Sequence, residues 1–342
     1  MVSMKDISIA CGVSIATVSK ALNDHGDIGE ETKKHIRQVA KDMGYLPNSQ
    51  ARALKTNRTH NIGVLFVDEA RSGLTHDYFS YLLDTFKSTV EENGYDVTFI
   101  NGSRKGRNQL SILEHCRYRG FDGVMIACVK FSDPEVVELV HSDMPIVTID
   151  YIFDNGIAIM SDNVKGMRDL LTYIYEQGHR RIAYIHGGDS GVTRKRVSSF
   201  YRTAEELGLN IPEEYVREVA YRDALAAGKV TRELLQLKEI PTCIIYPDDF
   251  SCIGGMTVIR ELGYKIPEQI SVAGYDGISI GRCMEPQLTT IKQDTHRLGY
   301  EAAKKLIALI ERPKTTLREP VMVGGILYTG GTVCRMNEEG HA

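Results

Sequence analysis

Four charged side chains stand where apolar runs end, and together they could bind a polar ligand. Asp150, Asp248 and Asp276 each follow an apolar run typical of a buried strand, and Arg196 lies early in the helix expected after a fourth run. One carboxylate accepts two hydrogen bonds and a guanidinium group donates two from a rigid fork, which suits the hydroxyl groups of a sugar. Ligands of open α/β sheets bind beyond the carboxyl ends of the strands. The pattern therefore predicts a site for a small polyhydroxylated ligand.

Two neighbouring aromatic residues could complete this site. Tyr78 and Phe79 stand near the start of a helix predicted over residues 78–93, and either ring could stack on a sugar face or on a flat base. A purine is the weaker alternative, because four charged groups exceed what a flat base requires. Plain structural roles are also open, since Asp249 could cap a helix and the aromatic pair could belong to the core.

Residues 3–20 form a second candidate site, with the pattern of a helix, a tight turn and a second helix. Ser3 stands three residues before Asp6, as in a capping box, and Gly12 permits the turn. Ser14 then caps a helix whose start presents small and polar side chains, which lets it enter the major groove of DNA. The candidate DNA-reading residues are Ser14, Ile15, Ala16, Thr17, Ser19 and Lys20.

Charge is distributed unevenly along the chain. Residues 1–60 carry nine Lys and Arg against six Asp and Glu, a net charge of +3, whereas the remainder has a net charge of −7. A basic head on an acidic body fits a DNA-binding protein whose phosphate contacts come from the head. The same excess would fit an ordinary solvated surface, so the charge only supports the motif.

Composition argues against several other classes of protein. The seven cysteines include no Cys-x-x-Cys pair and the ten histidines no His-x-x-x-His pair, which disfavours a disulfide framework and a metal site. No long apolar run or signal segment is present, so we expect a cytoplasmic protein. Residues 188–191 are similar to a protease nucleophile loop, but no matching His and Asp pattern accompanies them. We therefore expect no enzyme activity, no cofactor and no metal.

The pattern of apolar residues changes after residue 60. Apolar runs then alternate with helical stretches, first up to about residue 150 and again from residue 164 to residue 275, with a further helix over residues 298–310. Such alternation predicts βα units on parallel sheets. The predicted fold class is an all-α helix-turn-helix head followed by an α/β body of two doubly wound, parallel-sheet subdomains.

Motifs along nearly the whole chain resemble the lactose-repressor (LacI/GalR) family of bacterial transcription regulators. The matching segments are Gly12-Val13-Ser14, Thr17-Val18-Ser19, Leu22-Asn23, Gly44-Tyr45, Pro47-Asn48, residues 51–54, Ile62-Gly63-Val64, Ser161-Asp162-Asn163, Gly178-His179, residues 267–276 and residues 288–291. Their order and spacing are specific, although any one tripeptide would be weak. The resemblance implies a periplasmic-binding-protein-like body with a ligand cleft between its halves. It also implies that Asp150, Arg196, Asp248 and Asp276 contact the ligand.

The same resemblance implies a hinge helix over residues 48–55 that contacts DNA. A leucine of this helix enters the minor groove in the family, and Leu54 matches it, with Asn48, Ala51 and Lys55 as further DNA-binding candidates. Inserting an apolar side chain between base steps kinks the duplex. On the residues alone, a plain linker in which Leu54 packs against the next domain stays open.

The resemblance also implies how the chain is divided. The expected parts are a DNA-binding domain (1–47), a hinge and linker (48–60), an N-terminal subdomain (61–162 with 292–320), a C-terminal subdomain (163–291 with 321–335) and a tail (336–342).

The function implied is that of a regulator, and more specifically a repressor. It would bind a palindromic operator as a homodimer and respond to a small effector, for which a sugar is expected. A solute-binding receptor and an α/β enzyme are the other classes, and residues 1–55 and the lack of a catalytic constellation disfavour them. Lys20 stands where the family often has arginine, which is expected to alter base choice.

Overall fold

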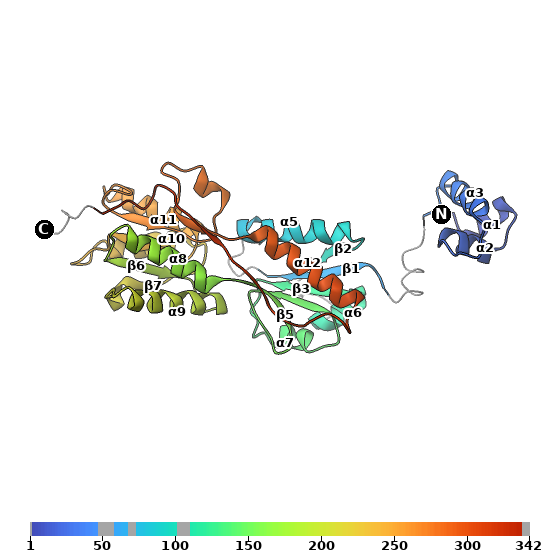
Figure 1. Ribbon diagram of the computed structural model, residues 1–342, viewed down its shortest axis with the longest axis horizontal. Coiled ribbons are helices and arrows are strands. Elements are labelled where there is room, and N and C mark those ends of the chain that lie inside the picture. Colours follow the sequence, from blue (N-terminus) through green and yellow to red (C-terminus); the bar gives the residue numbers. More distant parts are fainter. Residues whose placement is uncertain (1, 47–57, 68–72, 101–109, 337–342) are drawn as a thin grey trace. The chain divides into compact units, whose positions relative to one another are not determined.

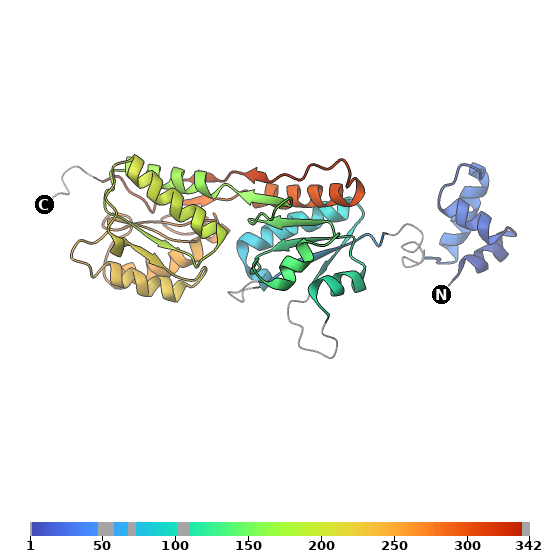
Figure 2. The ribbon, with the colours of Figure 1, turned by 90° about the horizontal axis from the view of Figure 1, so that it is seen from below.

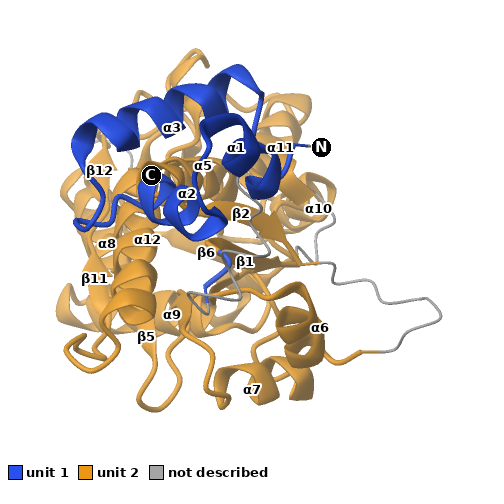
Figure 3. Ribbon diagram, turned by 90° about the vertical axis from the view of Figure 1, so that its right-hand side faces the viewer, with its two compact units in different colours: residues 1–59 blue, residues 60–342 orange. Residues whose placement is uncertain are grey.

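The computed structural model describes residues 2–46, 58–67, 73–100 and 110–336 of the 342-residue chain. The chain divides into two compact units, residues 1–59 and residues 60–342 (Figure 3). The hinge candidates Asn48, Ala51, Leu54 and Lys55 lie outside the described residues, so the hinge helix stays a prediction.

Unit 1 is a three-helix head made of α1 (Met4–Cys11), α2 (Ile15–Leu22) and α3 (Glu30–Asp42). The capping box is confirmed, because the Asp6 carboxylate accepts from the Ser3 backbone N–H at 2.8 Å and Ser3 Oγ accepts from the Asp6 N–H at 3.4 Å. Gly12 ends α1 at φ 65°, a left-handed conformation that glycine adopts without strain. A shared core of Ile7, Val18, Ala21, Ile36 and Ala40 joins the helices.

The first subdomain of unit 2 is built on a six-stranded parallel sheet in the order β11-β5-β4-β3-β1-β2. Its strands are β1 (Asn61–Phe66), β2 (Asp96–Phe99), β3 (Gly123–Ala127), β4 (Ile146–Ile149), β5 (Ile157–Ser161) and β11 (Val321–Val323). Its helices are η1 (Gly73–Thr75), α5 (Asp77–Glu92), α6 (Ile112–Arg119), α7 (Pro134–Val140) and α12 (Thr295–Glu311). Helices α5 and α12 lie side by side on one face of the sheet, and α6 and α7 cover the other (Figures 1 and 2).

The second subdomain repeats this plan around a four-stranded parallel sheet in the order β7-β6-β8-β9. Its strands are β6 (Ile182–His186), β7 (Val216–Glu218), β8 (Cys243–Ile245) and β9 (Ser271–Ala273). Helices α8 (Asn163–Glu176) and α9 (Gly191–Glu206) pack on one face, and α10 (Ala224–Leu234) and α11 (Asp249–Glu261) pack on the other. Short helices η2 (Glu213–Tyr215) and η3 (Ser279–Arg282) complete it. Helices on both faces explain why the strands are continuously apolar.

Three segments join the subdomains. The first leads from β5 into α8; the second follows β10 (Thr290–Lys292), which pairs antiparallel with β12 (Ile326–Tyr328). As expected, α12 then returns to the first subdomain, where it packs on β3, β4 and β5. Strand β11 also belongs there, because Val321 pairs with Ile159 of β5.

The pairing of β11 corrects the boundary drawn at residue 320. The third crossing follows Val323, so residues 321–323 belong to the first subdomain. The sequence patterns also do not predict β5, β10 or β12. Strands β10, β11 and β12 have three residues each, and their place depends on long-range pairing more than on periodicity.

Among the described helices, none is both long enough and apolar enough to cross a membrane.

Candidate DNA-reading surface and ligand site

Helix α2 presents one side to solvent and the other to the head's core. Ser14 begins the helix, and its Oγ accepts from the backbone N–H of Thr17 at 3.0 Å. Val18 and Ala21 are buried. Of the candidate DNA-reading residues, Ser14, Ile15, Ala16 and Lys20 are exposed, and Thr17 and Ser19 are half-buried. The surface is therefore small and mostly uncharged, with one cation at its far end.

Lys20 is held by a carboxylate in the absence of DNA. Its Nζ lies 2.5 Å from Asp27 Oδ2, and this hydrogen bond is the main cause that lowers the pKa of Asp27. Both side chains are about half exposed, at 48% and 54%. An exposed pair of this kind is weak and is screened by salt, so Asp27 does not fix Lys20 in place.

The first subdomain contributes a carboxylate surrounded by hydroxyl groups. Asp150 follows β4 at φ 58°, and Oδ2 accepts from Tyr78 OH and from Ser161 Oγ, both at 3.1 Å. Oδ1 accepts from the Ser161 backbone N–H at 2.6 Å. Burial nevertheless dominates these hydrogen bonds and raises the pKa of Asp150. The group is thus oriented by side chains and backbone of its own subdomain.

The second subdomain contributes a guanidinium group fixed on several sides. Arg196 of α9 is 3% exposed, and its Nε donates to Asn163 Oδ1 at 2.7 Å. One terminal nitrogen donates to the Pro247 carbonyl at 2.9 Å, and the Cζ lies 3.5 Å from the centre of the Tyr275 ring. The other terminal nitrogen lies 3.8 Å from Asp276 Oδ1. A planar cation held this way presents a fixed donor to a ligand.

Asp276 faces this guanidinium group from the end of β9. Its backbone has φ 105°, a conformation that L residues rarely adopt, and Gln293 Nε2 donates to its Oδ1 at 2.7 Å. Burial raises the pKa of Asp276 to about 7, although Arg196 opposes the shift. The side chain is 13% exposed. Asp276 therefore ionises near neutral pH and keeps oxygen lone pairs for a ligand.

Asp248, by contrast, accepts three hydrogen bonds from its own subdomain. Its side chain caps α11, where Oδ1 accepts from the Ser251 backbone N–H and Oδ2 from Ser251 Oγ, both at 2.8 Å. Oδ2 also accepts from the Arg222 backbone N–H at 2.8 Å. The capping role considered for Asp249 thus belongs to Asp248, while Asp249 is fully buried and accepts from Thr290 Oγ1 at 2.6 Å.

The two aromatic candidates differ in how they are packed. Tyr78 is buried, and its hydroxyl serves Asp150 and Ser161. Phe79 is half-buried in a group of edge-to-face rings, with its centroid 4.9 Å from Tyr78 and 5.2 Å from Phe66. Phe79 packs against the core and keeps some exposed area for a ligand.

Side chains from the two subdomains meet in this region. Arg222, in the loop after β7, donates to Asp77 of α5 at 3.2 Å. Tyr221 beside it lies 2.9 Å, OH to Oγ1, from Thr193 of α9. Sequence reasoning missed both residues, although Tyr221 and Arg222 follow a predicted strand end and the same rule could have found them. Asp150, Arg196 and Asp276 are close enough to influence the pKa values of common neighbours, and the structure brings these three candidates together.

The comparisons with known proteins agree with this architecture. Residues 3–48 match the family model for bacterial regulatory proteins of the lacI family, and residues 171–333 match the periplasmic-binding-protein-like domain. The ribose operon repressor of Escherichia coli K12 is 30% identical over 338 residues, covering 97% of this chain and all of that protein. The transcriptional repressor PurR of Vibrio atlanticus is 28% identical, covering 91% and 92%.

Solved structures give the same fold. A Lac repressor dimer bound to operator and an anti-inducer matches with a TM-score of 0.83 and 22% identity, covering 97% of this chain and 99% of that one. A LacI-family regulator from Enterococcus faecium with bound ribose matches with a TM-score of 0.69 and 22% identity, covering 81% and 100%. The curated relatives are transcriptional repressors and not enzymes. This chain belongs to the lacI family of bacterial regulatory proteins, and it is a DNA-binding transcription regulator.

Proposed function

We propose that this regulator is a homodimeric repressor that binds a palindromic operator and responds to a small neutral sugar. The observation that carries the effector part is the group formed by Asp150, Arg196 and Asp276. Two subdomains contribute to it, and it offers both acceptors and a fixed donor. Such a set matches hydroxyl groups, each of which donates one hydrogen bond and accepts others.

The charge around this group favours a neutral ligand. Five carboxylates stand there, those of Asp77, Asp150, Asp248, Asp249 and Asp276. Among the described residues, the guanidinium groups that oppose them are those of Arg196 and Arg222. Burial raises the pKa values of Asp150, Asp249 and Asp276, so this region already disfavours negative charge, and a sugar acid or a sugar phosphate would add more. Sugar hydroxyls add none, and they can donate to Asp150 and Asp276.

The ligand would act on DNA binding through the two subdomains. Arg196 and Asp276 belong to the second, and Asp150 belongs to the first. A ligand that bridges them stabilises one arrangement of the subdomains over another, and a typical coupling is about 1–3 kcal/mol. The hinge residues 48–55 would transmit this change to the head.

The dimer is supported by an apolar surface on the first subdomain. Leu74, Tyr81 and Phe99 are about half exposed, at 57%, 50% and 47%, and β2 is one of the two edge strands of the sheet. Exposed apolar surface of this kind marks interaction sites, and a two-fold dimer matches a two-fold operator. On the head, Ile15 and Ala16 would approach thymine methyl groups while Lys20 reaches a guanine or a phosphate.

The effector class can be tested by calorimetry on the full chain. D-Ribose, cellobiose, galacturonate and hypoxanthine would be titrated into the wild-type protein and into Arg196→Met. We expect a neutral sugar to bind the wild type and to lose most of its affinity in the variant. Tight binding of hypoxanthine with no response to any carbohydrate would replace the sugar by a purine, which the half-exposed ring of Phe79 could stack against. Tight binding of galacturonate would contradict the neutral ligand.

A further inference from the structure

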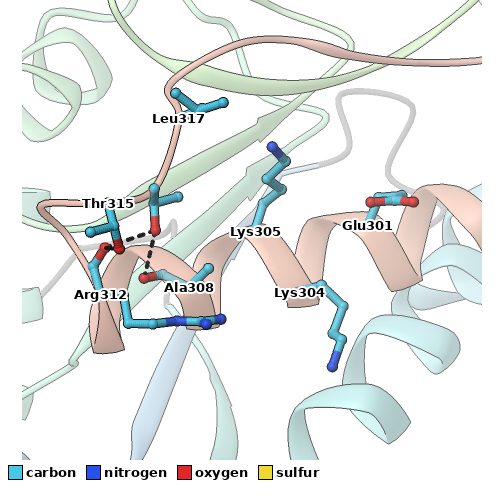
Figure 4. A pocket seen from close by; sticks show the side chains of 8 residues that line it. Glu301, Lys304, Lys305, Ala308, Arg312, Thr315 and Leu317 are labelled. Carbon is cyan, nitrogen blue, oxygen red and sulfur yellow. Dashed lines mark hydrogen bonds between the residues drawn. The ribbon is translucent and has the colours of Figure 1, made fainter.

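A depression of about 380 Å³ lies on the first subdomain at the carboxyl end of α12. It is distinct from the residues assigned to the effector. Figure 4 shows its lining side chains, which come from the last three turns of the helix and from the segment that follows. They are Glu301, Lys304, Lys305, Ala308, Arg312, Thr315, Thr316 and Leu317. We call this surface the α12 groove.

The α12 groove is a basic region on an acidic body. Residues 296–319 contain six Lys and Arg against three Glu, a net charge of +3, whereas the rest of residues 61–342 has a net charge of −10. Lys304 and Arg312 are exposed, and among the described residues no carboxylate oxygen lies within 4.0 Å of either cation. Lys305 lies 3.9 Å from Glu319, which is a loose and partly exposed pair. These cations are available to an external anion.

The end of the helix does not need these cations. The Thr316 hydroxyl donates to the carbonyl oxygens of Ala308 and Arg312, both at 2.9 Å, and Thr315 Oγ1 lies 3.4 Å from the same Arg312 oxygen (Figure 4). Terminal carbonyl groups of a helix usually attract lysine and arginine. Hydroxyl groups occupy the carbonyl oxygens of Ala308 and Arg312 here, so basic side chains are not required at those two oxygens.

The groove stands near the point where the chain enters unit 2. Glu311, the last residue of α12, accepts from Tyr95 OH at 3.4 Å, and the Tyr95 ring lies 5.0 Å from that of His60. His60 is the first residue of unit 2. The chain from Leu46 of the head to His60 can span at most about 50 Å even if fully extended. DNA held by the head therefore stays within reach of this end of the body.

We propose that the α12 groove binds the phosphate backbone of DNA that flanks the operator. The inference rests on operator binding by the head, as proposed above. An acidic body held close to DNA would repel it, and a basic groove at the linker end reverses that repulsion locally. Duplex DNA is the polyanion that this regulator's own function brings within range. Each phosphate neutralised releases counterions, so the contact adds affinity and salt dependence without sequence preference.

The test compares two duplexes and three proteins by fluorescence anisotropy between 50 and 200 mM salt. One duplex holds only the operator, selected from a random pool, and the other carries 15 base pairs more on each side. The proteins are the wild type, the groove variant Lys304→Gln/Lys305→Gln/Arg312→Gln, and a matched control, Arg202→Gln/Lys229→Gln/Lys238→Gln. The control removes three exposed cations from the second subdomain.

We expect a loss of DNA affinity and of its salt dependence only for the groove variant, and only on the long duplex. Each lost phosphate contact removes about 0.9 from the slope of log K against log salt, so the slope should fall by about 2–3 and the affinity by about tenfold at the lowest salt. On the short duplex all three proteins should bind alike. Equal slopes for the wild type and the groove variant on the long duplex would overturn the inference, as would an equal loss in the control.

Two other outcomes separate this inference from the proposed function. An acidic or phosphorylated protein as the groove's true partner would leave both DNA slopes unchanged, which contradicts DNA as the ligand. Failure of the wild type to select or bind any operator would contradict operator binding itself. Normal operator binding with no effect of flank length would contradict only the α12 groove.

Discussion

The two subdomains contribute different sets of groups to the candidate ligand site. In the first, Asp150 is held by hydrogen bonds from Ser161 of β5 and Tyr78 of α5, and burial raises its pKa. In the second, Arg196 is fixed between an amide oxygen, a carbonyl oxygen and an aromatic ring, and its charge is permanent. The second subdomain thus contributes a fixed donor together with an acceptor, Asp276, whereas the first contributes an acceptor alone.

The largest effect is expected from removing the fixed donor. In Arg196→Met, Asp276 loses its nearest cation and Asn163 its hydrogen-bond donor. Breaking a buried ion pair costs several kcal/mol, and we expect about 3 kcal/mol less free energy of unfolding, because Asp276 can take up a proton. Sugar binding should be abolished, as measured by calorimetry alongside urea unfolding.

Arg196→Lys is the matched control for this variant. It keeps the charge and loses the fork, so part of the stability should return while sugar affinity stays low. Full sugar affinity in Arg196→Met would show that the second subdomain is not the fixed half of the site.

The next effect concerns how the affinity for sugar depends on pH through the titration of Asp276. Ionised Asp276 accepts hydrogen bonds from sugar hydroxyls, so sugar affinity in the wild type should rise between pH 6 and pH 8, through its pKa of about 7. Asp276→Asn should weaken binding by about tenfold or more at pH 8 and flatten this dependence. Calorimetry at four pH values measures both.

Stability should change in the opposite direction with pH. Between the unfolded pKa of 3.8 and the folded pKa of about 7, the folded protein binds this proton more tightly than the unfolded chain does. Asp276 therefore lowers the free energy of unfolding as the pH rises through this range. Asp276→Asn should be relatively more stable at pH 8 than at pH 5. An unchanged pH profile in the variant would assign the titration to another group.

A smaller effect is expected at Asp248, which shares its position after a strand with Asp276 but not its role. Asp248→Ala removes the cap of α11 and the acceptor for Arg222 N–H, with an expected loss of about 1–2 kcal/mol in urea unfolding. Asp248→Asn can still cap α11 through its amide oxygen, but its N–H₂ then faces the Arg222 N–H, so we expect a smaller loss than in Asp248→Ala and not none. Because the carboxylate is occupied by the protein, sugar affinity should stay within about threefold. A large loss of affinity in Asp248→Asn would return Asp248 to the ligand.

The smallest effect should come from the ion pair that crosses between the subdomains. Arg222 and Asp77 are 3.2 Å apart, and the Asp77 side chain is 36% exposed. Such a pair contributes at most about 1 kcal/mol. Asp77→Asn should change sugar affinity about two- to threefold without altering the stability measurably. A tenfold change would make this pair a main determinant of how the subdomains are arranged.

The sequence predicts best what local rules govern. The capping box at Ser3, the turn at Gly12 and the helices of the βα units depend on residues a few positions apart, and the structure has them as predicted. The role of Asp248 depends instead on the backbone of Arg222, 26 residues away, which no local pattern encodes. For the same reason, strand β11 could not be placed, because its neighbour β5 lies more than 150 residues earlier.

In the candidate site, too, local patterns predict where residues lie, and long-range contacts decide what they do. Strand ends located Asp150 and Asp276 because parallel strands end at one edge of a sheet. The strand ends do not indicate which carboxylate oxygens remain available to a ligand. That depends on hydrogen bonds from Gln293, Ser161 and Ser251 to particular oxygens. Asn163 and Tyr275 fix Arg196, and their places in the family motifs do not indicate this role.

The most direct test of the central claim joins the two halves of the site to DNA. Fluorescence anisotropy would follow the wild type, Arg196→Met and Asp150→Asn on the selected operator, with and without the neutral sugar that binds in calorimetry. We expect the sugar to change the wild-type operator affinity by at least fivefold and to leave Arg196→Met unchanged, with equal affinities of all three proteins when no sugar is present. A sugar that binds the wild type without changing its operator affinity, or that still changes the affinity of Arg196→Met, would contradict the account.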